Sequence, residues 1–266
     1  MKVRDVIRAV EAFAPFDAQK PGDNTGLQIG SPDQEVHGIL LGFDCTPELV
    51  DEAVRRGCDM IINHHPLLYH PVRSVGPDDP TGAAIWRAVR AGVAVYAAHT
   101  SADRVIAGVS GAMARRLGLQ HVRILAPEGV RSDVPGESIG FGVVGDLPQA
   151  LSAREAIELV KERFGLRVVR TSRPVDIPVR TLAMCGGSGS SLIDAARAAG
   201  AQLYLCGDIS YHYFFTPADF MLADIGHFES EVEIVEVFLT VLRKNFPNFA
   251  IHISDNIKNS NPVYYF

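Results

Sequence analysis

Two stretches of the chain repeat one pattern of buried strand, helix and buried strand, and this repetition limits the fold more than any other feature. In the first stretch, apolar residues 38–43 and 60–62 predict strands, and Thr46 and Pro47 between them predict the start of a helix. In the second stretch, the corresponding strands are residues 181–185 and 203–206, and the helix between them is residues 191–199. Alternating strands and helices favour a parallel sheet covered by helices.

A constant offset of 143 positions aligns these stretches. It matches Leu49, Asp51, Ala53 and Gly57 with Leu192, Asp194, Ala196 and Gly200, and it places His65 on Asp208. A further predicted strand then ends at His99 in the first half and at His227 in the second, and each histidine is followed four residues later by a carboxylate. We therefore expect two similar α/β lobes, an internal pseudo-repeat.

The boundary between the lobes is predicted from local composition. Glycine and proline surround a short strand at 139–144, and a capping box then begins at Ser152. We expect residues 1–126 to form the first lobe, 127–151 a connecting segment and 152–266 the second lobe.

The charge balance argues against two classes of protein. The chain has 25 Lys and Arg against 31 Asp and Glu, a net charge of −6, so nucleic-acid binding is not expected. No apolar run approaches the ~18 residues that a membrane span needs, and residues 1–10 do not resemble a signal peptide. We expect no membrane association.

The four cysteines, at positions 45, 58, 185 and 206, are far apart and form no CxxC pair. This spacing is typical of a reducing compartment and argues against a thiolate zinc site. We expect a cytoplasmic protein whose thiols act as small apolar side chains.

Histidines follow the predicted strands where a parallel sheet binds its ligands. His64 and His65 follow one strand, and His99 and His227 end two others. The carboxyl ends of parallel strands line the ligand crevice of an α/β sheet. Imidazole together with carboxylate is a ligand set for Zn, Fe, Mn, Ni or Co.

The number of candidate ligands favours two ions over one. The metal ligands that we predict are His64, His65, Asp103, His227 and Glu231. Five side chains exceed the three of an open catalytic zinc site, whereas two divalent ions could activate water for hydrolysis. His99 is expected to support catalysis beside the ligands. Alternatively, the paired histidines form a solvated turn and the segment after His227 is a helix start with favourable carboxylates.

Two further segments are candidates for substrate binding. Gly186, Gly187 and Ser188 lie between a strand and a helix, where backbone amides could hold an anion; a tight turn that needs glycine is the alternative. Asp208 and His212 could contact substrate or transfer a proton, and a helix cap followed by core aromatic residues is the alternative.

These motifs occur in an order that resembles the Nif-three-like (interacting factor three) family, whose members are also called GTP cyclohydrolase 1 type 2 homologues. The matching segments are Asp23-Asn24-Thr25-Gly26-Leu27, Gly42-Phe43-Asp44, His64-His65-Pro66, His99-Thr100-x-x-Asp103, Cys185-Gly186-Gly187-Ser188-Gly189, Gly207-Asp208 and Gly226-His227-x-x-x-Glu231. They extend over nearly the whole chain. The family often has Asn where this chain has Ser101.

The resemblance implies a two-lobed α/β protomer, a homohexamer and a dinuclear metal centre in the cleft between the lobes. By motif match it implies the same five metal ligands, with Glu231 as a bridge between the ions. The expected function is metal-dependent hydrolysis of a nucleotide or another small phosphorylated or heterocyclic substrate, similar to GTP cyclohydrolase. The alternative is a non-catalytic, metal-bound hexameric scaffold or a metal-handling or regulatory protein.

The end of the chain is apolar and aromatic, with Val263, Tyr264, Tyr265 and Phe266 in its last positions. We expect this segment to pack on its own protomer or on a neighbour, and a frayed terminus is the alternative.

Overall fold

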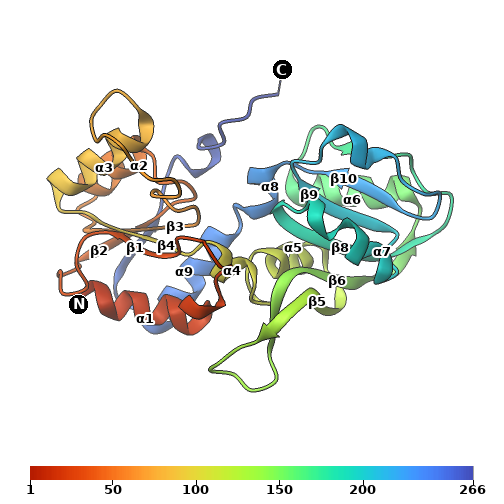
Figure 1. The fold of residues 1–266 in the computed structure, drawn as a ribbon, viewed down its shortest axis with the longest axis horizontal. Coiled ribbons are helices and arrows are strands. Elements are labelled where there is room, and N and C mark those ends of the chain that lie inside the picture. The colour runs from red at the N-terminus through yellow and green to blue at the C-terminus, as the bar shows by residue number, and fades with distance from the viewer. Residues whose placement is uncertain (266) are drawn as a thin grey trace. The chain divides into compact units, whose positions relative to one another are not determined.

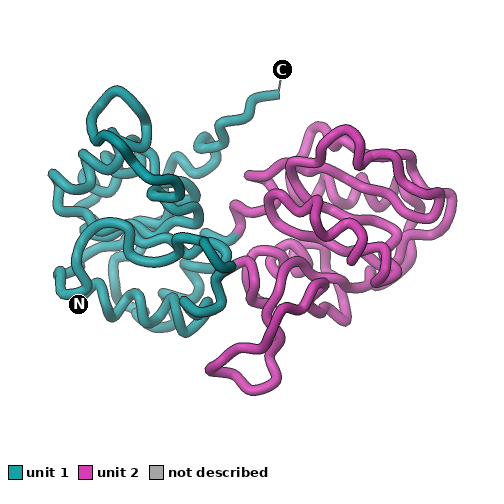
Figure 2. The backbone as a smooth tube through the Cα atoms, viewed as in Figure 1, with its two compact units in different colours: residues 1–102, 234–266 teal, residues 103–233 magenta. Residues whose placement is uncertain are grey.

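The computed structural model describes residues 1–265 and divides the chain into two compact units (Figure 2). Unit 1 contains residues 1–102 and 234–266, and unit 2 contains residues 103–233. Each unit has its own sheet, so the expected α/β fold with two lobes is confirmed.

Unit 1 has a mixed five-stranded sheet within the described residues. Its strands, in spatial order, are β1 (Gly26–Ile29), β4 (Ala94–Ala97), β3 (Met60–Asn63), β2 (Gly38–Leu41) and β11 (Ala250–Ile253). β1 is antiparallel to β4, and the other neighbours are parallel. The central strands are buried on both faces, as their continuous apolar sequences predict.

Helices cover both faces of this sheet (Figure 1). They are α1 (Val3–Phe13), α2 (Pro47–Arg55), α3 (Pro80–Ala91), α9 (Ile234–Asn245) and the single turn α4 (Thr100–Asp103), with short 3-10 helices at Phe16–Ala18 and Ile257–Asn259. α2 and α3 lie on one face, and α1 and α9 on the other. The sequence predicts the start of α2 correctly, because the Thr46 side chain accepts a hydrogen bond from the Leu49 amide and Pro47 is the first helical residue.

Unit 2 has a six-stranded sheet in the part of the chain that the structure describes. The spatial order is β5 (Gln120–Val130), β6 (Ser138–Leu151), β8 (Val179–Ser188), β9 (Leu203–Gly207), β10 (Met221–Asp224) and β7 (Arg170–Thr171). β8, β9 and β10 are parallel, whereas β5, β6 and β7 each pair antiparallel with a neighbour. The connection between β5 and β6 projects from the sheet (Figure 1).

The helices of unit 2 are α5 (Val109–Leu117), α6 (Ala153–Phe164), α7 (Ile193–Ala198) and α8 (His227–Glu231), with 3-10 helices at Ser190–Leu192 and Tyr211–Phe214. α5 and α6 pack on one face of the sheet, where Leu182 and Leu205 point, and α7 packs on the other with Tyr204. α6 begins with the predicted capping box, in which Ser152 and Glu155 bond each other's backbone amides.

The bounds of the units differ from those of the predicted lobes 1–126 and 152–266. Residues 234–266 belong to unit 1, because β11 pairs with β2 and α9 packs against α1. Residues 127–151, expected to connect the lobes, mostly lie in β5 and β6 of unit 2. The first difference comes from a pairing between residues that are far apart in the chain, which composition along the chain does not reveal. The second comes from the antiparallel pairing of the consecutive strands β5 and β6, which extend through the segment expected to be a connection.

The C-terminal segment is also more exposed than expected. Tyr264 has 74% and Tyr265 52% of its surface exposed in the single chain. Phe266 lies outside the described residues, and packing of this segment on a neighbouring protomer stays a prediction. Across residues 1–265, no helix has the length and apolar character needed to cross a membrane.

Candidate metal centre

Three histidines of unit 1 come together just after the strands β3 and β4. His64 and His65 directly follow β3, and His99 is two residues beyond the end of β4. One ring nitrogen from each lies within 4.8 Å of the others. His64 is fully buried, whereas His65 and His99 are partly exposed. Parallel pairing of β3 with β4 thus brings together side chains more than thirty positions apart in sequence.

Each of these rings has its Nδ1 atom in a hydrogen bond. The His65 Nδ1 lies 2.7 Å from Oδ1 of Asp44, and the His99 Nδ1 lies 2.7 Å from Oδ1 of Asp23. The His64 Nδ1 lies 2.9 Å from the carbonyl oxygen of Ala98, which can only accept, so this nitrogen carries the proton. Nε2 is therefore the atom that each ring would offer to a metal ion, as in carboxylate–histidine–metal arrangements.

Asp23 is held in its ionised form by its neighbours. Burial alone would raise the pKa of Asp23, but the hydrogen bonds that it accepts from His99 and Thr100 keep that pKa well below its usual range. The Thr100 amide lies 3.1 Å from the Asp23 Oδ2. An ionised carboxylate can only accept, so it orients the His99 ring with a proton on Nδ1.

Unit 2 presents a histidine and a glutamate on one turn of helix. His227 and Glu231 are the first and last residues of α8, and the His227 Nε2 lies 3.0 Å from Oε2 of Glu231. The other ring nitrogen lies 2.7 Å from Oδ2 of Asp208. Hydrogen bonding to Glu231 and then to Asp208 raises the pKa of His227 to about 9, although burial opposes the shift. The carboxylates of Glu231 and Asp208 thus favour positive charge at this position, and a metal ion would replace the proton on the ring nitrogen that it binds.

The remaining predicted ligand, Asp103, is the last residue of α4 and is partly buried. It follows His99 by one turn, as the sequence motif predicts. Of the predicted ligands, His64 and His65 belong to unit 1, and Asp103, His227 and Glu231 belong to unit 2.

Glycines 186 and 187 make room for the side chains of α8. Gly187 has a φ of +61°, and a Cβ atom there would lie 2.3 Å from Oε1 of Glu231. The Gly187 amide donates to Oγ of Ser230 at 2.9 Å, and the Gly186 amide donates to Oγ of Ser110 at 3.3 Å. These two amides are engaged within the unit, so the structure agrees better with a turn that needs glycine than with an anion-binding loop. A substrate role for Ser188, where β8 ends, stays a prediction.

Asp208 and His212, the other substrate candidates, have different surroundings. Asp208 orients His227 and adopts a left-handed backbone conformation with a φ of 55°, which aspartate tolerates better than most residues. His212 lies on the exposed 3-10 helix Tyr211–Phe214, with its ring 5.4 Å from that of Tyr211. A catalytic role for His212 stays a prediction.

Spacing and residue type in the sequence predict no role for Asp23 and Asp44. Both lie within motifs that carry the family resemblance, which was the available signal. The hydrogen bonds show that they orient His99 and His65, whose positions in the sequence are 76 and 21 residues away.

The four cysteines are buried and lack disulfides. Burial raises the pKa of Cys45 and of Cys206 to about 12, and burial raises that of Cys185 well above its ordinary value. Neutral thiols are poor metal ligands. The candidate donors are therefore imidazole nitrogens and carboxylate oxygens, which fit a first-row divalent cation.

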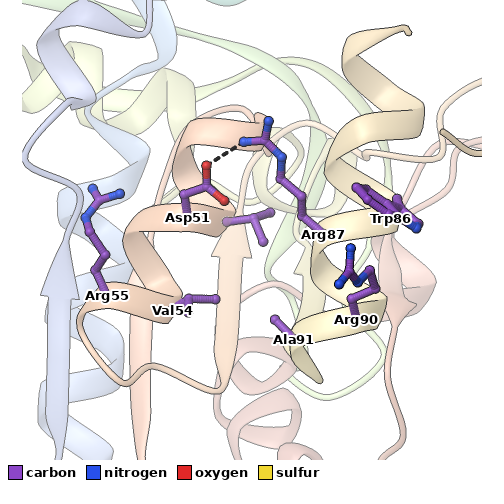
Figure 3. A pocket seen from close by; sticks show the side chains of 8 residues that line it. Asp51, Val54, Arg55, Trp86, Arg87, Arg90 and Ala91 are labelled. Atoms are coloured by element: carbon purple, nitrogen blue, oxygen red, sulfur yellow. Dashed lines mark hydrogen bonds and ion pairs between the residues drawn. The ribbon is translucent and has the colours of Figure 1, made fainter. Parts of the chain in front are cut away.

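A separate hollow of about 540 Å³ lies between α2 and α3 of unit 1 (Figure 3). Arg87 of α3 forms an ion pair with Asp51 of α2, and the Arg90 guanidinium lies 4.5 Å from the centre of the Trp86 ring. Its lining comes from two helices and includes arginines, an aspartate and apolar side chains. This chemistry differs from that of the strand-end histidines, so this hollow is not the candidate metal centre.

Comparisons with known proteins give one consistent result. The family model of Duf34/NIF3 (NGG1p interacting factor 3) matches residues 1–260. A Clostridium acetobutylicum protein named GTP cyclohydrolase 1 type 2 homolog is 32% identical over 262 residues, covering 96% of each chain. The protein of the same name from Streptomyces coelicolor is 36% identical over 213 residues, covering 79% of this chain and 74% of its own.

The fold also has a match among solved structures. The crystal structure of a Bacillus cereus protein related to NIF3 has a TM-score of 0.89, with 100% of this chain and 99% of that chain covered. At 23% sequence identity, this likeness shows the fold alone.

Proposed function

The chain belongs to the Duf34/NIF3 family, and on that premise we propose that it is a metal-dependent hydrolase of a nucleotide or another small phosphorylated or heterocyclic substrate. The proposed cofactor is a pair of divalent ions bound by His64, His65, Asp103, His227 and Glu231. Bound ions would supply Lewis acidity and an activated water at neutral pH.

One observation carries this proposal. Three histidines of unit 1 converge within 4.8 Å, and each has its Nδ1 engaged by a fixed acceptor. A purely structural role does not require ring nitrogens of three oriented imidazoles to lie this close together. Ion binding by His64 and His65, with His99 beside them as a proton-transfer group, explains the convergence. The His227–Glu231 pair adds imidazole and carboxylate donors in unit 2.

The residues around these ligands have separate tasks. Asp44 and Asp208 orient His65 and His227 and increase their basicity as ligands. We propose that His99 is a proton-transfer group, because ionised Asp23 can stabilise its imidazolium form. This is the same role that a carboxylate has beside a catalytic histidine in hydrolases.

The names of relatives, together with this chemistry, support the proposed substrate class. Relatives at 31–36% identity are named GTP cyclohydrolase 1 type 2 homologs. Opening a purine ring by hydrolysis requires an activated water, which two bound ions could supply. We also propose a homohexamer in the cytoplasm, on the basis of the family resemblance and the reduced, widely spaced cysteines.

The test compares His65→Ala with His37→Ala. His37 is exposed and lies outside the histidine cluster, so its replacement controls for the loss of an imidazole. Both proteins are screened for hydrolysis of nucleotides and phosphoesters, before and after chelation. We expect His65→Ala to lose both metal and turnover while keeping the wild-type circular dichroism spectrum, and His37→Ala to behave as wild type.

Wild-type turnover in His65→Ala would show that the catalytic assignment is wrong. Bound metal without turnover on any substrate of the screen would favour the alternative of a metal-bound scaffold.

A further inference from the structure

The hollow of about 540 Å³ between α2 and α3 has an apolar centre. Val54 of α2 and Ala91 of α3 point into the gap between the two helices, and Trp86 lies farther along α3 (Figure 3). Val54 has 51% of its surface exposed, and Trp86 has 40%. Exposed apolar side chains that adjoin one another around a hollow are typical of a surface that binds another molecule.

Arginines lie on both sides of this apolar centre. Arg55 lies on the α2 side and Arg90 on the α3 side, and Arg87 reaches across the gap to pair with Asp51 (Figure 3). Within residues 1–265, no carboxylate forms an ion pair with Arg55 or Arg90. Three arginines against one aspartate leave the hollow with an excess of two positive charges, although the whole chain has a net charge of −6.

Trp86 fixes the position of Arg90. The Arg90 guanidinium lies 4.5 Å from the centre of the Trp86 ring, which is the distance of a cation–π interaction. A guanidinium stacked on a ring keeps the N–H donors of its edge available for a carboxylate. Tryptophan and arginine are also enriched among the side chains that dominate binding at protein interfaces. This pair is therefore suited to a carboxylate that is attached to an apolar partner.

The charges favour an acidic protein segment over other anions. Packed helices are about 8–10 Å apart, so a ligand that reaches both Arg55 and Arg90 spans two helices, as a chain segment does. Nucleic acids and anionic membranes have a high density of negative charge, which a chain with a net charge of −6 repels at long range. An acidic segment needs only the local excess of positive charge, and its apolar side chains would pack on Val54 and Trp86.

We propose that this surface, the α2–α3 face, binds an acidic segment of a partner protein that also carries large apolar side chains. The α2–α3 face consists of Val54, Arg55, Trp86, Arg90 and Ala91. Carboxylates of the segment pair with the two arginines, and its apolar side chains pack on the valine and the tryptophan. The proposal does not depend on the hydrolase function, because none of the five candidate metal ligands is among the residues that line the hollow.

The experiment titrates the full-length, as-purified protein with a short acetylated and amidated peptide of Glu, Asp, Leu and Phe. One comparator has Ser in place of Leu and Phe, and the other has Lys in place of Glu and Asp. Isothermal titration calorimetry gives the affinity, and the fluorescence of Trp86, the only tryptophan, reports binding at the α2–α3 face. We expect the acidic apolar peptide to bind and to change the Trp86 emission. The serine peptide should bind about tenfold more weakly, and the lysine peptide should not bind.

Charge-neutral variants test the two arginines. Arg55→Gln and Arg90→Gln should each weaken binding of the acidic apolar peptide about tenfold. Arg8→Gln is the matched control, because Arg8 is an exposed arginine of α1, which covers the other face of the sheet. We expect the control to keep the wild-type affinity, and all three variants to keep the wild-type circular dichroism spectrum and metal content. The affinity of the wild type should fall as salt is added, because exposed charges are screened.

Four results would overturn the proposal. The first is that the acidic apolar peptide does not bind at millimolar concentration, and the second is that wild type, Arg55→Gln and Arg90→Gln bind it equally. The third is that the double variant Arg55→Gln, Arg90→Gln dissociates the wild-type assembly in analytical ultracentrifugation, which would show that the α2–α3 face joins copies of this chain. The fourth is that wild type, but not the double variant, binds phosphatidylserine vesicles at physiological salt, which would assign the face to a membrane.

Discussion

The two units share one topology but differ in the residues that follow their strands. The order β1-β4-β3-β2 in unit 1 corresponds to β7-β10-β9-β8 in unit 2, with the same parallel and antiparallel pairings. The connection from β3 to β4 contains α3, whereas the connection from β9 to β10 contains one 3-10 helix within the described residues. The apolar strand pattern determines the common framework, and the strand ends carry the chemistry.

At equivalent positions, the two units exchange the roles of ligand and orienting residue. His65 of unit 1 is a candidate ligand oriented by Asp44. Its equivalent 143 positions later is Asp208, which orients the candidate ligand His227. The equivalent of Asp44 is Gly187, whose missing side chain leaves space for Glu231. Similar frameworks thus present the same donor types through different residues.

The largest difference in stability that we predict between equivalent positions of the units is at Glu52, whose equivalent in unit 2 is Ala195. Glu52→Ala leaves the Ser254 hydroxyl and the Asp255 amide without their acceptor and removes one of the two carboxylates that pair with Arg56, the other being Asp255. We expect the free energy of unfolding to fall by about 3 kcal/mol or more. Urea unfolding followed by fluorescence measures this, because Trp86, the only tryptophan, is in α3 of unit 1.

Asp51→Ala is the control for Glu52, since it removes an exposed ion pair from the same helix. That change should cost no more than about 1 kcal/mol. A loss below about 1 kcal/mol for Glu52→Ala would mean that the C-terminal segment is not held by this network.

Gly187→Ala should destabilise unit 2 more than a comparable glycine substitution. The substitution places an alanine in a left-handed backbone conformation and brings its Cβ into a steric clash with Glu231. We expect the free energy of unfolding to fall by about 3 kcal/mol. Gly200→Ala has the same backbone cost without any atom within 4 Å, and about 1 kcal/mol is expected. Gly57→Ala, the equivalent change in unit 1, should match Gly200→Ala. Urea unfolding followed by circular dichroism tests the series, and equal losses at all three positions would refute the role of Gly187.

Replacing the orienting aspartates tests whether both units hold metal in the same way. Asp44→Asn and Asp208→Asn keep the size of the side chain but remove its charge, and each should weaken metal binding about 10- to 100-fold. Competition with a chromogenic chelator gives the affinity, and Asp51→Asn should have no effect. An unchanged affinity in either aspartate variant would assign the hydrogen bond of that unit to structure alone.

We expect the smallest difference between the units in the reactivity of their cysteines, because the cysteines of both units are buried. At pH 8, a thiol with a pKa of about 12, such as Cys45 or Cys206, is a thiolate in roughly one molecule in 10⁴. Because the thiolate is the reactive form, labelling of the native protein should be very slow and should accelerate as pH rises. Thiol-reactive dye should modify the four cysteines only after unfolding, and rapid labelling of native protein would contradict their burial.

The sequence predicts those features that depend on neighbouring residues. The Thr46-Pro47 start of α2 and the capping box at Ser152 are local signals, and both helices begin where these signals lie. The offset of 143 positions predicts two similar lobes, because buried strands keep their apolar pattern, and the two sheets share a strand order.

Long-range pairings are not visible in this way. β11 joins β2 of unit 1 although about 210 residues separate them, and apolar periodicity does not select a pairing partner. The candidate ligands followed from histidines at strand ends, but which carboxylate faces which ring depends on loop conformation. Asp23 and His99 meet across 76 positions, and only the folded chain shows that they do.

Metal content per chain is a direct measure of the proposed dinuclear site. Inductively coupled plasma mass spectrometry of protein purified without added metal, and again after reconstitution with divalent ions, should give two ions per chain for the wild type. Glu231→Ala, which lacks the proposed bridging carboxylate, should lose both ions, and His37→Ala should keep them. A wild-type chain that holds no metal after reconstitution would show that these residues do not form a metal site.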